Sequence, residues 1–185
     1  MPKAVVVVPY DPSWGEAFAQ LHTALWPVVA DVATSIEHVG STAIPGLAAK
    51  PVLDIDVVVP GARIPEAVAR LVAIGYVHRG DLGIPGREAM RRPPQSVAHH
   101  LYVCDDSSPA LRNHLAVRDA LRADSARAAA YGALKQRLAR EHPTDMDAYL
   151  RGKTAFLVAL LRDAGFPEAT LDEIAQQNGL RGAPR

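Results

Sequence analysis

The spacing of apolar residues changes in character along the chain, and the change divides it into two halves. Up to about residue 105, runs of β-branched residues alternate with helical stretches, and most of the prolines and glycines fall there. From about residue 109 to 178 the sequence is rich in alanine, leucine and arginine and has a helical period. The pattern predicts a small mixed sheet flanked by helices and then a helical C-terminal half, which is an α+β fold.

The individual elements follow from the local spacing and from the residues that begin and end each run. Strands are expected over 34–39, 52–59 and 99–104, and the middle one carries β-branched residues on both faces, as a covered central strand does. Asp11 should cap a first helix that Pro12 opens and that Pro27 should kink or split. Further helices are expected over 65–74, 109–122, 124–141, 144–163 and 167–178, the last closed by Gly179.

Residues 80–95 contain several prolines, glycines and arginines, and their apolar residues follow neither the helical nor the strand period. They are therefore expected to form a long loop. Loops of this length inside a compact domain are often functional. Arg87, Arg91 and Arg92 would then form a basic flap over a substrate, or simply belong to a solvated surface loop.

Composition narrows the class of protein. The 185 residues, 49% of them apolar, favour a single domain over 1–185, with an α/β core in 1–106 and a helical part in 107–180. Basic and acidic residues balance at 20 each, so a nucleic-acid partner is not expected. No apolar stretch reaches the roughly 18 residues of a membrane span, and Cys104 alone forms neither an intrachain disulfide nor a cysteine zinc cluster. A cytoplasmic protein without a membrane partner is expected.

The predicted strand 52–59 carries two acids within an apolar run. Its period of two places Asp54 and Asp56 on the same face. Neighbouring carboxylates repel each other, and burial raises the cost of charging them. A divalent cation between them resolves the conflict, and Mg²⁺ commonly takes one or two carboxylates together with substrate phosphate oxygens. The alternative is that both acids lie on an exposed face or pair with arginines.

A short turn precedes this strand. In Gly40-Ser41-Thr42, the glycine would let backbone N–H groups approach a phosphate and the serine hydroxyl could donate to it. The same three residues could also be an ordinary helix cap. Together with the two aspartates about a dozen residues later, they supply phosphate donors and a metal platform, which are the two needs of phosphoryl or nucleotidyl transfer.

The longer string around these residues resembles a known family. Segments 10–14 (YDPSW), 38–51 (HVGSTAIPGLAAKP) and 54–55 (DI), and further on 100–101 (HL), 118–122 (RDALR), 131–135 (YGALK) and 149–153 (YLRGK), are similar to the GrpB family of the DNA polymerase β-like nucleotidyltransferase superfamily. The similarity covers about residues 8–162 and implies a nucleotidyltransferase fold. The family is mostly of unassigned function, and in some bacteria such a domain is fused to dephospho-coenzyme A kinase. Many relatives carry glutamine where this chain has Asp56. With the aspartate kept, this chain looks better suited to bind a metal ion than those relatives.

The superfamily usually adds a third carboxylate from a later strand, and the matching strand here has no acid before Asp105. His100, or His99 on the opposite face, could serve as a metal ligand or proton acceptor, or could be hydrogen-bonded within the sheet. The family usually reads His-Leu-His on this strand, and Tyr102 replaces the last histidine. A three-acid mechanism therefore cannot be assumed.

Several basic side chains are candidates for phosphate binding, each with an ordinary alternative. Lys50 could neutralise a phosphate or pair with an acid, and His38 could orient the turn or pack at the strand end. The resemblance extends the phosphate role to Lys135 and Lys153, which would otherwise be solvated helical lysines. Arg118 and Arg122 lie one helical turn apart, a spacing suited to gripping an anion, although neighbouring aspartates could make them ordinary salt bridges.

Three functions are weighed. The first is an enzyme that binds Mg²⁺ (or Mn²⁺) and ATP or another nucleoside triphosphate and transfers a nucleotidyl group to a small-molecule acceptor, with His100 as the base. A variant of it is an ATP-dependent ligase that forms an adenylate. The second is a non-catalytic nucleotide-binding or accessory module linked to coenzyme A metabolism. The third, polymerisation of DNA or RNA, is disfavoured by the zero net charge and the few aromatic residues.

Overall fold

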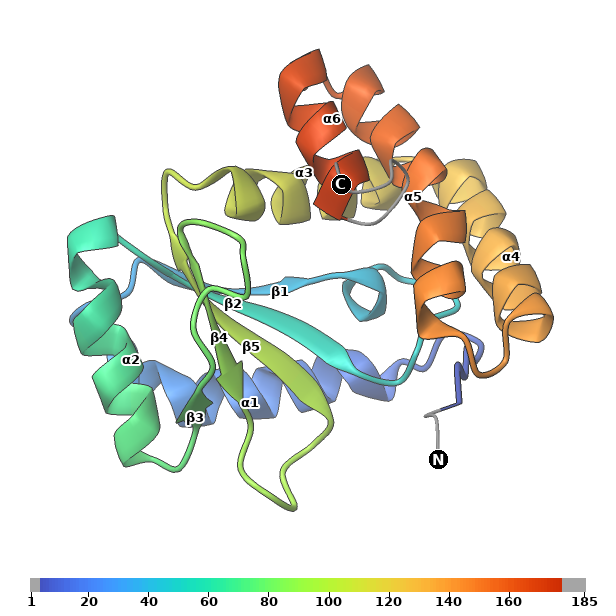
Figure 1. Cartoon of the computed structure of the whole chain (residues 1–185). Coiled ribbons are helices and arrows are strands. Elements are labelled where there is room, and N and C mark those ends of the chain that lie inside the picture. Colours follow the sequence, from blue (N-terminus) through green and yellow to red (C-terminus); the bar gives the residue numbers. More distant parts are fainter. Residues whose placement is uncertain (1–3, 178–185) are drawn as a thin grey trace. The chain divides into compact units, whose positions relative to one another are not determined.

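The computed structural model describes residues 4–177, and its elements are labelled in Figure 1. The strands are β1 (Ser35–Val39), β2 (Leu53–Val59), β3 (Val77–His78), β4 (Arg87–Arg91) and β5 (His99–Asp105). The helices are α1 (Ser13–Val29), α2 (Ile64–Ala73), α3 (Pro109–Ala123), α4 (Ser125–Glu141), α5 (Met146–Asp163) and α6 (Glu168–Gln177), with short 3₁₀ turns η1 (Ser41–Ala43) and η2 (Gly61–Arg63). The expected α+β class, a mixed sheet with a helical C-terminal half, is confirmed. The expected helix end at Gly179 lies outside the described residues.

The described chain forms two compact units that interleave along the sequence. The first, called here the sheet unit, consists of residues 11–43 and 52–115. The second, the helical unit, consists of residues 4–10, 44–51 and 116–177. α3 contributes to both units, since residues up to Leu115 belong to the sheet unit and those from Ala116 to the helical unit, and the segment before β2 belongs to the helical unit.

The sheet unit contains all five strands, in the order β1-β2-β5-β4-β3. β2 and β5 run parallel and the other neighbouring pairs run antiparallel. The register places Asp54 opposite His100 and Asp56 opposite Tyr102. β2 therefore lies inside the sheet, as its β-branched composition predicts, and all but one of its residues are buried.

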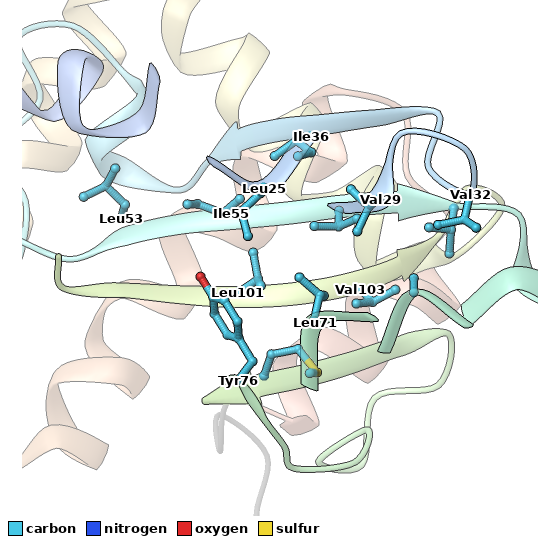
Figure 2. Packing of buried hydrophobic residues seen from close by; sticks show 14 residues of the cluster. Leu25, Val29, Val32, Ile36, Leu53, Ile55, Leu71, Tyr76, Leu101 and Val103 are labelled. Carbon is cyan, nitrogen blue, oxygen red and sulfur yellow. The ribbon is translucent and has the colours of Figure 1, made fainter. Parts of the chain in front are cut away.

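One face of this sheet carries the main hydrophobic core, which packs against α1 and α2 (Figure 2). The odd-numbered residues of β2 and β5, such as Ile55 and Leu101, point into it and meet Leu25 and Leu71 of the helices. The even-numbered residues lie on the opposite face, where Val58 and Cys104 pack with Leu111 from the first turn of α3. Strand alternation thus separates an apolar face from the face that carries the two acids.

The structure differs from the expectations for the sheet unit in two places. α1 is not split at Pro27 and ends at Val29, because a proline in the last turn removes a single hydrogen bond close to the place where the helix stops in any case. Residues 80–95 are not one long loop, since Arg87–Arg91 forms β4 and pairs with β5. The strand was missed because Arg-Glu-Ala-Met-Arg is polar and short, and only its partner strand shows that it is paired.

The helical unit is built from α4, α5 and α6 with the second half of α3. Its helices begin where the sequence predicts them, because Asp124 accepts a hydrogen bond from the backbone N–H of Arg127 and Asp145 from that of Ala148, both at 2.9 Å. Leu121, Tyr131 and Leu160 form one of its apolar clusters. Among residues 4–177, no helix is both long and apolar enough to cross a membrane.

Candidate functional site

The acids of β2 and the even-numbered residues of β5 form a polar face in the sheet unit. Asp54 and Asp56 share it, as the alternation predicts, with His100 and Tyr102 beside them on β5. The two carboxylates differ in environment: the Asp54 side chain is 34% exposed, and the Asp56 side chain is 0% exposed. A charged group so deeply buried needs hydrogen bonds or a cation to offset its lost hydration.

Asp54 is paired with His100. The ring Nδ1 lies 2.9 Å from Oδ1 of Asp54, and because an ionised carboxylate only accepts, Nδ1 carries the proton and donates it. In the neutral ring with this tautomer, the other nitrogen, Nε2, keeps its lone pair. The His100 side chain is 53% exposed, so Nε2 is in a position to accept a proton from a ligand.

Asp56 is paired with a residue that the sequence did not indicate, His114 of α3. The ring Nδ1 donates to Oδ2 of Asp56 at 2.7 Å. Burial disfavours the charged ring, but the attraction of the Asp56 carboxylate outweighs it, and the pKa of His114 is raised above its ordinary value. Nothing in the sequence could have linked a helix residue to a strand 58 positions earlier, because only the packing of α3 on the sheet brings them together.

The second oxygen of Asp56 has no hydrogen-bond partner among the described residues. Oδ1 is buried and unsatisfied. Few buried polar atoms of folded proteins lack a partner, so each one calls for a physical explanation. A bound cation would supply that partner.

Tyr102 lies opposite Asp56, at the position where the resemblance leads one to expect the last histidine of His-Leu-His. Burial and then the charge of Asp54 raise the pKa of Tyr102 to about 12, so its hydroxyl stays protonated. The guanidinium carbon of Arg87 lies 4.3 Å from the centre of its ring. Burial and the charge of Asp56 also raise the pKa of Cys104, which leaves that thiol uncharged.

The Gly-Ser turn lies directly against this face. Gly40 has φ +68°, a conformation that favours glycine, and a Cβ placed on it would come within 2.9 Å of Cγ of Asp54. Ser41 begins η1, and the buried Thr42 hydroxyl lies 3.0 Å from Nε2 of His38. His38 also stacks on Phe18 with 4.7 Å between ring centres, so His38 packs at the strand end.

His99 points to the opposite face and takes no part in this arrangement. Its Nδ1 donates to the carbonyl of Val97 at 2.7 Å, and the Tyr76 hydroxyl donates to its Nε2 at 2.8 Å. Burial lowers the pKa of His99. Of the two histidines considered on this strand, His100 is the one beside the acids.

The predicted lysines belong to the helical unit. Lys50 and Lys153 approach the same ring, with Nζ atoms 5.9 Å and 5.5 Å from the centre of Tyr149. Lys135 is buried and its Nζ lies 4.6 Å from the centre of the Tyr131 ring. Lys50 and Lys153, far apart in sequence, thus meet around one tyrosine.

The two predicted arginines lie in the second half of α3, in the helical unit. Arg118 donates through Nε to Asp119 at 2.7 Å, so the salt bridge weighed for it exists. Arg122 lies in the last turn of the helix. Their anion-binding role, like that of the lysines, stays a prediction.

The donor set can be tested against the expected cation. Within residues 4–177, no three His, Cys, Asp or Glu side chains converge as metal ligands. Two carboxylates on one face, one with an unsatisfied buried oxygen, fit a hard cation such as Mg²⁺, which takes its remaining ligands from water and substrate oxygens. They do not fit zinc, which is usually held by three or four protein ligands.

The arrangement of a five-stranded mixed sheet, a Gly-Ser turn and two alternating aspartates defines a nucleotidyltransferase-like fold. The structure of Cid1 in complex with its short product ApU has a TM-score of 0.51 at 12% identity, over 69% of this chain and 42% of that chain. At this level of identity the similarity concerns the fold alone.

The chain belongs to the GrpB family: the family's sequence profile, described as GrpB protein, matches residues 4–163. The crystal structure of conserved protein GrpB from Enterococcus faecalis has a TM-score of 0.77 at 33% identity, over 91% of this chain and 98% of that one. A UPF0157 protein of Pseudomonas aeruginosa is 35% identical over 96% of this chain and 74% of its own length. UPF0157 protein YqkA of Bacillus subtilis is 34% identical over 84% of this chain, and the match spans 46% of YqkA, about half of its length.

Proposed function

We propose that this protein binds Mg²⁺ and a nucleoside triphosphate, ATP first among them, and transfers the nucleotidyl group to a small-molecule acceptor. The observation that carries the proposal is Asp56: a fully buried carboxylate with one unsatisfied oxygen, on the same face as Asp54. Gly40, left without a side chain beside Asp54, supports it. The GrpB family and the nucleotidyltransferase-like fold agree with it.

Each group on this face would have a separate task. Asp54 and Asp56 would hold Mg²⁺, which when bound would screen the charge on the phosphate oxygens. Gly40 and Ser41 would bind phosphate oxygens, and the buried Thr42 would fix the turn through His38. His114 would hold the Asp56 carboxylate in one orientation.

The reaction balances as a displacement at phosphorus. A hydroxyl or amine of the acceptor attacks the α-phosphorus and forms the new bond, while the bond from the α-phosphorus to the bridging oxygen breaks and pyrophosphate leaves with the electron pair. The proton of the attacking group goes to Nε2 of His100. The hydrogen bond from Nδ1 to Asp54 keeps that ring in the correct tautomer and orientation.

In the helical unit, Lys50 and Lys153 are proposed to bind phosphate oxygens, because two ammonium groups around one tyrosine ring offer a concentrated positive charge. Arg118, Arg122 and Lys135 are proposed as supporting cations of that unit. No nucleic-acid partner is proposed, since the chain as a whole carries no net positive charge.

A second candidate is a nucleotide-binding module without turnover, which one observation favours. The strand on which the resemblance leads one to expect a third acid, β5, has no acid before Asp105. A site that binds nucleotide but lacks part of the metal platform would sense nucleotides or assist a partner enzyme of coenzyme A metabolism. Strong nucleotide binding without pyrophosphate release would favour this candidate over the enzyme.

The test is calorimetric titration of the four nucleoside triphosphates, with and without Mg²⁺. We expect Mg²⁺-dependent binding to the wild type and its loss in an Asp54→Asn, Asp56→Asn double variant. An Asp106→Asn variant is the control, because Asp106 is an exposed acid just after β5 in the same unit. A wild type that binds no triphosphate, or a double variant that binds as tightly as the control, would refute the proposal.

A further inference from the structure

Arg87 lies on the acid-bearing face, and its guanidinium has no polar partner among the described residues. Its side chain lies on that face, since Arg87 is paired with Cys104 in the ladder between β4 and β5. Its Nε is buried and has no hydrogen-bond partner, and within residues 4–177 the side chain forms no ion pair. Its guanidinium lies over the Tyr102 ring, with 4.3 Å from the guanidinium carbon to the ring centre.

This arrangement is unusual because anionic partners lie on the same face. The charge of Arg87 acts on both His114 and Tyr102, as do the charges of Asp54 and Asp56. An arginine in such surroundings would be expected to pair with a carboxylate, but both carboxylates are instead paired with histidines. The five N–H donors of the guanidinium are therefore left for a group that residues 4–177 do not provide.

The shape of the guanidinium also indicates what kind of group would fit. The group is planar, and its N–H donors point outward in that plane as a rigid fork. Carboxylate and phosphate oxygens match that fork with two parallel hydrogen bonds. The geometry favours an oxyanion over a neutral ligand.

The backbone before Arg87 is fixed, so this side chain does not belong to a mobile flap. Gly86 has φ +75°, and a Cβ on it would lie 2.8 Å from Cβ of Ser108. The carbonyl of Gly86 accepts a hydrogen bond from the backbone N–H of Asp105 at 2.9 Å. The neighbouring arginines differ, since Arg91 is exposed and Arg92 donates to the carbonyl of Ser96 at 2.6 Å.

The strand order shows which part of a substrate Arg87 would meet. The turn at Gly40 follows β1, on one side of the acids of β2, and Arg87 lies on β4, beyond β5 on the other side. In displacement at phosphorus the attacking and leaving groups lie on opposite sides of the phosphorus atom. If the turn holds the leaving pyrophosphate, the acceptor approaches over β5 and β4.

From this geometry we propose that the acceptor is an anionic small molecule, bearing a carboxylate or a phosphate, and that Arg87, positioned over the Tyr102 ring, binds that oxyanion. The statement that this anion is the acceptor rests on the proposed nucleotidyl transfer. The statement that Arg87 binds an oxyanion does not depend on the proposed function.

The first test uses the wild-type protein and nuclear magnetic resonance of the arginine Nε–H groups, with the Arg87 signal assigned by its absence in Arg87→Lys. We expect inorganic phosphate or acetate to shift that signal, and chloride at equal ionic strength to leave it in place. The anion that binds more tightly distinguishes a phosphate-bearing acceptor from a carboxylate-bearing one. An Arg87 signal that neither anion moves, or that moves no more than that of Arg91, would overturn the proposal.

The second test separates the acceptor from the nucleotide. Arg87→Gln should weaken binding of the preferred anion at least tenfold and leave Mg·ATP binding within about twofold of wild type, and Arg91→Gln on the same strand should change neither. If Arg87→Gln instead weakens Mg·ATP tenfold and the anion competes with Mg·ATP, Arg87 binds the triphosphate and the acceptor assignment is wrong. If the wild type binds no triphosphate, the proposed function is refuted. The oxyanion site is then still tested separately, by the titration with phosphate and acetate.

Discussion

Replacing His114 should show how far the buried carboxylate of Asp56 depends on the imidazole hydrogen bond. Asp56 is 0% exposed, Oδ1 has no hydrogen-bond partner among the described residues, and Oδ2 accepts from Nδ1 of His114 at 2.7 Å. His114→Ala would leave the carboxylate buried without its histidine partner and beside the weakly donating, uncharged Cys104 thiol. Removing one partner of a buried ion pair costs about 3–5 kcal/mol, so we expect a loss of that order in the free energy of unfolding at pH 7.

The chain supplies a matched comparison in His78 and Glu88. Their pair is 2.6 Å long, nearly the same as that of His114 and Asp56, but its side chains are 42% and 25% exposed. Exposed ion pairs contribute about 0–1 kcal/mol, so His78→Ala should cost no more than that. Both are histidine–carboxylate pairs, so the difference between the two losses in the free energy of unfolding measures the effect of burial.

Urea unfolding followed by tryptophan fluorescence suits this comparison, because both tryptophans, Trp14 and Trp26, lie on α1 in the sheet unit. The His114→Ala substitution should also be made in an Asp56→Asn background, where position 56 carries no charge. The loss in the free energy of unfolding should then fall to about 1 kcal/mol. A cost below about 1 kcal/mol in the wild-type background, or an equal cost in both backgrounds, would refute the reasoning.

Three further outcomes can be checked with the same protein. Gly40→Ala should abolish Mg²⁺-dependent nucleotide binding, because its Cβ would meet Asp54, whereas Gly46→Ala, with φ +77° and open space around it, should cost only the backbone strain of about 1–2 kcal/mol and leave binding intact. Tyr76→Phe should lower the free energy of unfolding by about 1–3 kcal/mol, because it leaves a buried ring nitrogen of His99 without its donor. Since burial lowers the pKa of His99 in the folded state, its neutral form contributes stability above the ordinary pKa near 6.5, and that contribution is lost as the pH falls. Urea unfolding at pH 7 and pH 5 should show a larger loss for the wild type than for His99→Gln, and equal losses would contradict this assignment.

Much of the fold follows from local sequence, because local energetics decide it. Asp124 and Asp145 begin their helices with side-chain caps that depend only on residues three positions ahead. The period of two places Asp54 and Asp56 on one face whatever the strand pairs with. The turn at Gly40 could likewise be predicted from the sequence, because a turn that requires a positive φ after a strand selects glycine locally.

The composition of the candidate site was decided by tertiary structure. β4 is polar and short, and it exists as a strand because β5 offers it hydrogen-bonding partners. His114 reaches Asp56 across 58 positions, and Arg87 reaches Tyr102 only through the pairing of β4 with β5. Sequence periodicity predicts which side of an element a residue occupies, but which elements face each other depends on long-range packing of the whole sheet. The acids could therefore be predicted from the sequence, and their histidine partners and the unpaired arginine could not.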